Sequence, residues 1–117
     1  MNQIPIRTPE RDALAHRVHL RMARQGRIAE IDSILADLVE RKRAARRKID
    51  TAGDEAAKAK SSAVSAITRS GFSDGSAGLR ATRQAKQDAE DELEVLGEAE
   101  SELKSERAEL LAIVDLN

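Results

Sequence analysis

The residues best suited to chemistry in this sequence are two histidines within one predicted helix. His16 and His19 are three positions apart, so a helix would place both imidazoles on one face, where they would supply half of a metal site. No third ligand is apparent on that face, and the sequence contains no Cys. Surface histidines are far commoner than metal ligands. We therefore interpret both as surface residues and predict no metal site.

Two further patterns lack the spacing that their chemistry requires. The glycines at 71, 75 and 78 are not followed by the Gly-Lys-Ser/Thr sequence of a phosphate-binding loop. The acidic cluster around Asp88 lacks the spacing of ligands in a calcium loop. Two predicted helices also cannot enclose the shielded pocket that catalysis needs. The sequence predicts no catalytic residue, no cofactor and no enzymatic activity.

A third chemical feature is a row of arginines near the N-terminus. Residues 7–30 hold six arginines and only three acidic residues. Guanidinium groups bind phosphates and carboxylates, so the row fits either nucleic acid or an acidic protein surface. Aromatic side chains that would stack on bases are absent from this stretch, which favours protein contact over nucleic acid. The predicted basic surface comprises Arg11, Arg17, Arg21, Arg24 and Arg27.

Long helices must position these side chains. The strong helix formers Ala, Glu, Lys, Leu and Arg dominate the sequence, and no proline follows Pro9. An apolar seam with alternating steps of four and three runs from Leu14 to Ala66, a pattern typical of a coiled coil. Thr8 and Pro9 suit an N-cap and a first helical position. We predict an extended lead-in over 1–8 and a long helix over 9–70.

The stretch 71–78 is rich in glycine and serine and predicts a hairpin loop, with Gly71 as a left-handed helix cap. A second seam from Leu79 to Val114 predicts a helix over 76–117. The expected fold is all-α: a single-domain, long antiparallel helical hairpin (coiled coil) with helix 1 longer than helix 2. Phe72, at the hairpin tip, is expected to fold over the end of the seam or to anchor a partner.

A turn centred near residue 74 fixes the expected register of this hairpin. Ala45 would then face Leu103, and Ala52 would face Leu96, so that small residues oppose large ones. The basic run 41–48 would lie opposite an acidic stretch over 98–109 and be balanced by it. Gly53 and Gly97 would come to nearly the same level, which suggests a close helix approach or a bend, although unrelated glycines would look the same.

In this register helix 2 ends opposite about Ile31, which leaves residues 9–30 of helix 1 without an intramolecular partner. An exposed apolar stripe of that length is a liability in a monomer, so the segment should pack on another copy of the chain or on a different protein. A homo-oligomer is the expected form. The predicted contact residues are Leu14, Val18, Met22, Ile28, Ile31 and Leu35.

These features predict a non-enzymatic coiled-coil structural or assembly protein. A Cys-free, Ala/Arg/Glu-rich hairpin resembles an assembly component of a phage particle or of a secretion apparatus, by analogy of form alone. The alternatives are a small regulatory or inhibitory binder of another protein complex and a nucleic-acid-binding accessory protein that uses the arginine row. No stretch approaches a membrane span, so the expected location is the cytoplasm or, for a phage protein, the virion.

Overall fold

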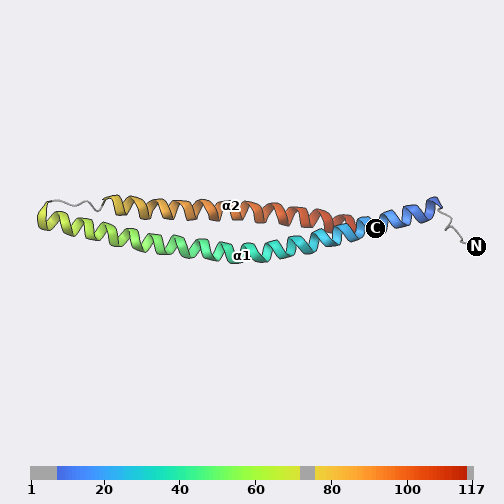
Figure 1. Cartoon of the computed structure of the whole chain (residues 1–117), viewed down its shortest axis with the longest axis horizontal. Helices are drawn as coiled ribbons and strands as arrows, with labels where there is room; N and C mark the ends of the chain where they lie inside the picture. The colour runs from blue at the N-terminus through green and yellow to red at the C-terminus, as the bar shows by residue number, and fades with distance from the viewer. Residues whose placement is uncertain (1–7, 72–75, 116–117) are drawn as a thin grey trace, which may run out of the picture. The chain divides into compact units, whose positions relative to one another are not determined.

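The computed structural model describes residues 8–71 and 76–115. Two helices, α1 (Pro9–Ser70) and α2 (Ser76–Asp115), make up this part of the chain, and it contains no strand (Figure 1). The all-α fold class is therefore confirmed, as is a helical hairpin in which the first helix is the longer. The predicted conformations of residues 1–7 and of residues 72–75, Phe72 among them, lie outside the described residues. Residues 76–78, which the predicted loop and the predicted second helix shared, belong to α2.

Local sequence signals set both ends of α1. At the N-terminus, the Thr8 side-chain oxygen accepts a hydrogen bond from the Arg11 backbone N–H at 3.2 Å, as an N-cap residue does. At the C-terminus, Gly71 has φ +74° and its N–H donates to the Ile67 carbonyl at 2.8 Å. This left-handed cap favours glycine because a Cβ would clash there. Both predicted caps are confirmed.

The chain divides into two compact units, one formed by Met1–Leu35 with Leu103–Asn117 and the other by Ala36–Glu102. In each unit a segment of α1 runs antiparallel to a segment of α2 (Figure 1). The buried apolar side chains all lie on the predicted seams, as expected for two packed helices. They are Ile31, Leu38, Ala45, Ala52, Ala89 and Leu96. The prediction of a single domain stays a prediction.

Two ion pairs fix the register of the Ala36–Glu102 unit. Lys42 lies 3.1 Å from Glu100, and Lys48 lies 3.7 Å from Glu92. Ala45, midway between the two lysines, is therefore level with Leu96. The predicted register, which placed Ala45 opposite Leu103, is wrong by about two helical turns of α2. The composition of the loop located the turn but did not determine where along α1 the first residue of α2 lies. Because α1 continues past the level at which α2 begins, α2 is displaced relative to the predicted register.

The predicted close approach at Gly53 and Gly97 is also wrong. The observed register puts the two glycines at different levels, and a Cβ built on either of them would meet no neighbouring atom within 4 Å. Neither glycine is required by helix packing. The open space means that the interior of this unit would accept alanine at both positions.

In the other unit, the last turns of α2 pack beside α1 around Ile31, which is fully buried. Arg27 donates two hydrogen bonds to the Glu106 carboxylate, at 2.8 and 3.0 Å, and Arg107 donates one to Asp32 at 2.7 Å. These pairs extend the contact along α1 to Arg27, and the half-buried Arg24 lies one turn further. The predicted unpartnered range of 9–30 is therefore too long.

Candidate functional site

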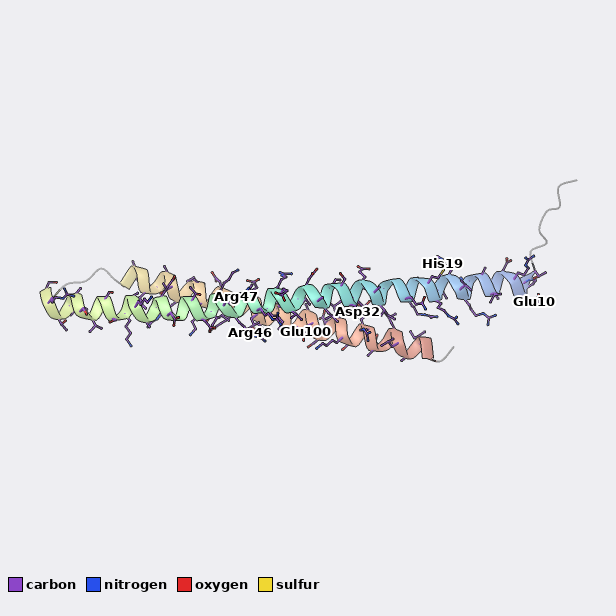
Figure 2. All side chains as sticks on the ribbon, turned by 90° about the horizontal axis from the view of Figure 1, so that it is seen from below. Glu10, His19, Asp32, Arg46, Arg47 and Glu100 are labelled. Carbon is purple, nitrogen blue, oxygen red and sulfur yellow. The ribbon has the colours of Figure 1, made fainter. Side chains whose placement is uncertain are left out.

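Residues 9–23 of α1, the exposed segment, are all solvent-exposed, although they form four turns of regular helix. Leu14, Val18 and Met22 have relative exposures of 57%, 48% and 66%. Figure 2 shows α1 near Glu10 and His19 without the described part of α2 beside it. An apolar stripe that the chain leaves uncovered is a candidate surface for contact with another molecule. The exposed segment is therefore the candidate functional site.

The three apolar residues of the exposed segment form one stripe because a spacing of four returns to the same side of a helix. Leu14, Val18 and Met22 line a shallow hollow of about 410 Å³ together with three flanking residues, namely Arg11, Ala15 and His19. An apolar floor bordered by a cation and an imidazole fits the interface chemistry of a protein better than that of a small polar substrate. The sequence prediction named the floor of this hollow and missed Ala15, which lies three residues before Val18 and so on the same side of the helix.

The arginines of the segment face a second hollow on the neighbouring side of α1. Arg17, Arg21 and Arg24 line a space of about 190 Å³, with Leu14 and Val18 at its border. Among the described residues, none of these guanidinium groups forms an ion pair, and the Nε of Arg24 is buried without a hydrogen-bond partner. Arg11 is likewise exposed and without an ion pair to any described residue. The cations here are therefore available to a ligand.

Arg27 differs from the other members of the predicted basic surface, because carboxylates of the same chain already bind it. It pairs with Glu106 and, at 3.0 Å, with Glu30 on its own helix. The hydrogen bond from Arg27 lowers the pKa of Glu106, and the same bond raises the pKa of Arg27. Arg27 thus belongs to the contact between α1 and α2, and the available basic surface consists of Arg11, Arg17, Arg21 and Arg24.

The structure also narrows the predicted set of contact residues. Ile31 is fully buried, and Ile28 and Leu35 are half-buried. Ile31 has no surface left for another protein because helix packing within its own unit covers it. Leu14, Val18 and Met22 remain exposed. The contact surface therefore reduces to its N-terminal half, and the predicted role of Phe72 lies outside the described residues.

The basic run 41–48 is divided between two environments. Lys42 and Lys48 pair with glutamates of α2, and Arg43 pairs with Glu40 on its own helix at 2.9 Å. Arg46 and Arg47 are exposed (Figure 2). Surface ion pairs of this kind contribute at most about 1 kcal/mol each, so they select the pairing of helices more than they stabilise it.

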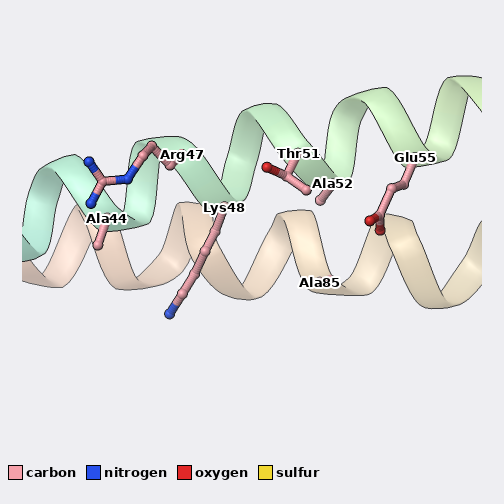
Figure 3. A pocket seen from close by; sticks show the side chains of 7 residues that line it. All are labelled: Ala44, Arg47, Lys48, Thr51, Ala52, Glu55 and Ala85. Atoms are coloured by element: carbon pink, nitrogen blue, oxygen red, sulfur yellow. The ribbon is translucent and has the colours of Figure 1, made fainter.

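An open groove runs along the Ala36–Glu102 unit (Figure 3). It measures about 470 Å³, and its lining includes Arg47, Lys48, Thr51 and Glu55 from α1 and Ala85 from α2. The groove arises because small alanines occupy the interface, so the two backbones leave space beside the seam. It is open to solvent along its length, so it does not shield the side chains that line it from water.

The described residues contain no group of three or more side chains able to share a metal ion. Within the same residues, neither helix has an apolar stretch long enough for a membrane span. Comparison of the chain with protein-family models, with curated proteins and with solved structures finds no match. The geometry of the exposed segment is therefore the evidence from which function must be argued.

Proposed function

We propose that this protein is a non-enzymatic coiled-coil structural or assembly protein that joins a larger complex through the exposed segment of α1. The observation that supports this is the uncovered stripe of Leu14, Val18 and Met22 beside unpaired arginines. Methionine and arginine are enriched at protein interfaces, and apolar residues form their cores. The rest of the hairpin would serve as a spacer that holds the segment in a helical conformation.

The parent complex in this proposal is a phage particle or a secretion apparatus, where helical hairpins of this kind serve as building elements. The support for this finer statement is the composition of the chain, which is rich in alanine, arginine and glutamate and free of cysteine. The protein would then act in the cytoplasm or in the virion. Purification of the chain from its native source with the particle or apparatus, and its loss from that fraction when Leu14 and Val18 are replaced, would test the assignment.

The first experiment measures whether the apolar stripe joins two copies of the chain. The absolute mass of the full chain is determined by light scattering after size-exclusion chromatography, at low and high salt. We expect a dimer or larger species that resists salt, and a monomer for the double variant Leu14→Asp/Val18→Asp. The matched control is Val95→Asp, since Val95 is exposed on α2 and lies away from the segment. Circular dichroism should show all three proteins equally helical.

A monomeric wild-type chain would rule out self-association and leave a different protein as the partner. The same Leu14→Asp/Val18→Asp variant then serves in pull-downs with candidate complexes, where loss of a defined partner relative to the Val95→Asp control would support the assembly role. Equal recovery of that partner with both variants would contradict any role for the stripe.

The unpaired guanidinium groups of Arg11, Arg17 and Arg21 support one alternative, a nucleic-acid-binding accessory protein. Such binding weakens steeply with salt because phosphate contacts release counterions. A DNA duplex at low salt should shift in mobility with wild-type protein and not with Arg17→Glu/Arg21→Glu. Absence of any shift with wild-type protein would eliminate this alternative.

A further inference from the structure

The seam of α1 changes chemistry without changing its spacing. Its fully or nearly fully buried positions, Ile31, Leu38, Ala45 and Ala52, are seven residues apart. A heptad repeat keeps such positions on one side of a coiled-coil helix. Continued toward the N-terminus, the same spacing reaches Arg24 and then Arg17. The side of α1 that α2 covers further along therefore continues into the exposed segment as a row of arginines.

These arginines border an incomplete site. Arg17, Arg21 and Arg24 line the hollow of about 190 Å³, and Leu14 and Val18 supply apolar surface at its edge. The buried Nε of Arg24 has no acceptor among the described residues. A buried donor without an acceptor costs free energy, and a carboxylate is the acceptor that a guanidinium group binds best in a protein interface. A ligand complementary to this hollow would therefore carry an anionic group next to an apolar one.

The described helices already show what packs against cations on this side of α1. In one unit Glu106 of α2 accepts both hydrogen bonds from Arg27. In the other unit Glu100 and Glu92 of α2 pair with Lys42 and Lys48. In each case an amphipathic helix presents glutamates beside its apolar seam. Arg21 lies three heptads before Lys42 and so occupies the same heptad position, whereas Arg17 and Arg24 continue the row of Ile31 and Leu38. None of the three pairs with a glutamate of the described residues.

A second copy of the same segment does not supply the missing carboxylates. A parallel, in-register pairing of two copies sets Arg17 against Arg17, and an antiparallel pairing centred on the row sets Arg17 against Arg21. Like charges in direct opposition disfavour both arrangements. The acidic residues of the segment, Glu10 and Asp12, lie at its N-terminal end, away from the hollow.

We propose that residues 14–24 of α1 dock an acidic amphipathic α-helix of a partner protein. Carboxylates of that helix pair with Arg17, Arg21 and Arg24, and its apolar residues cover Leu14 and Val18. The inference rests on the proposed function, in which this segment makes the contact, and it adds the chemistry of the partner. Self-association through Leu14, Val18 and Met22 would use two of the same apolar residues, so it would compete with the partner helix, and the light-scattering experiment tests it independently of the arginines.

The experiment uses two synthetic helical peptides of about three heptads that differ only in charge. Both carry leucine and alanine at the seam positions; one has glutamate and the other glutamine at the flanking positions. Fluorescence anisotropy with the full chain should show at least about tenfold tighter binding of the glutamate peptide, since two or three charge pairs supply that much. The preference should shrink as salt is raised, because exposed charge pairs are screened.

Two variants locate the binding. Arg17→Gln/Arg21→Gln should bind the glutamate peptide no better than the glutamine peptide. Arg46→Gln/Arg47→Gln removes the same charge from exposed positions elsewhere on α1 and should bind both peptides like the wild-type chain. All four substituted residues are exposed, so circular dichroism should show unchanged helix content for both variants.

Three results would overturn the inference. The first is equal binding of the two peptides by wild-type protein. The second is a glutamate-peptide preference that survives Arg17→Gln/Arg21→Gln. The third is tighter binding of a DNA duplex than of the glutamate peptide, or binding of a peptide copying residues 9–27 that is lost in Arg17→Gln/Arg21→Gln, which would assign the row to nucleic acid or to a second copy. If Leu14→Asp/Val18→Asp still dissociates an oligomer in any of these cases, the assembly role stands while the acidic partner does not.

Discussion

Two stretches of α1 share a heptad repeat and differ in almost everything else. From Ile31 to Ala52 the repeat is apolar and buried, and cations beside it pair with glutamates of α2. From Glu10 to Arg24 the repeat is largely charged, and residues as far as position 23 are exposed. Both stretches are helical. Helix formation by alanine, arginine and glutamate therefore does not depend on α2, whereas burial does, and the uncovered stretch is where a partner can add its own surface.

The largest expected effect on the free energy of unfolding comes from removing buried volume in the stretch of α1 that α2 covers. Ile31→Ala should lower the free energy of unfolding by roughly 2–5 kcal/mol, because Ile31 is fully buried. In a monomer, Leu14→Ala should change it by less than about 0.5 kcal/mol, because Leu14 is more than half exposed; in the proposed oligomer, which covers Leu14, the loss should be larger. Urea denaturation followed by circular dichroism measures both. Similar losses for the two variants would mean that the exposed segment is buried in solution, as in an oligomer.

The glycines provide the next contrast. Gly97→Ala should raise the free energy of unfolding by up to about 1 kcal/mol, because the helix gains propensity and the added Cβ enters open space. Gly71→Ala should lower it by about 1 kcal/mol, because residue 71 has positive φ. Thermal unfolding of the two variants and the wild-type chain compares them directly. A lower free energy of unfolding for Gly97→Ala would contradict the open space beside Gly97 and would support the close helix approach predicted from the sequence.

Acidification should weaken the unit that contains Arg27 and Glu106. The pKa of Glu106 is lowered in the folded chain, so its contribution to stability is present above the ordinary glutamate pKa of about 4.3 and is lost as the pH falls through the lowered value. Glu106→Gln should be less stable than wild type at pH 7 and equally stable near pH 2. Urea midpoints at both values measure this. A difference that persists at low pH would show that packing, and not charge, is what the substitution removes.

The smallest effect concerns the ion pairs of the Ala36–Glu102 unit. Lys42 and Glu100 are mostly covered, at 19% and 21% side-chain exposure, whereas Lys48 and Glu92 are at 66% and 38%. A double-mutant cycle with alanine should give a coupling near 1 kcal/mol for the first pair and close to zero for the second. Equal couplings would indicate that burial of the pair does not decide its strength.

The sequence by itself determined the two helices, the caps of α1 and most of the seams. Long runs of helix formers with a heptad repeat specify helices through local energetics, and Thr8 and Gly71 end α1 through hydrogen bonds to its own backbone. The unpaired state of Leu14 and Val18 also followed from the unequal helix lengths. The helices and the caps of α1 need only neighbours within a few residues, whereas the uncovered stripe follows from the lengths of the two helices.

Register and the true extent of the uncovered segment were decided by tertiary structure alone. Sliding α2 by one heptad keeps the seams matched, so pattern cannot select among registers. The register is selected by contacts between the two helices. Leu96 lies level with Ala45, and carboxylates of α2 reach Arg27 and Lys42. That choice moved Ile31 and Arg27 from the predicted contact surface into the hairpin. It left Arg17, Arg21 and Arg24 among the cations that pair with no carboxylate of the described residues, because α2 places no glutamate beside them.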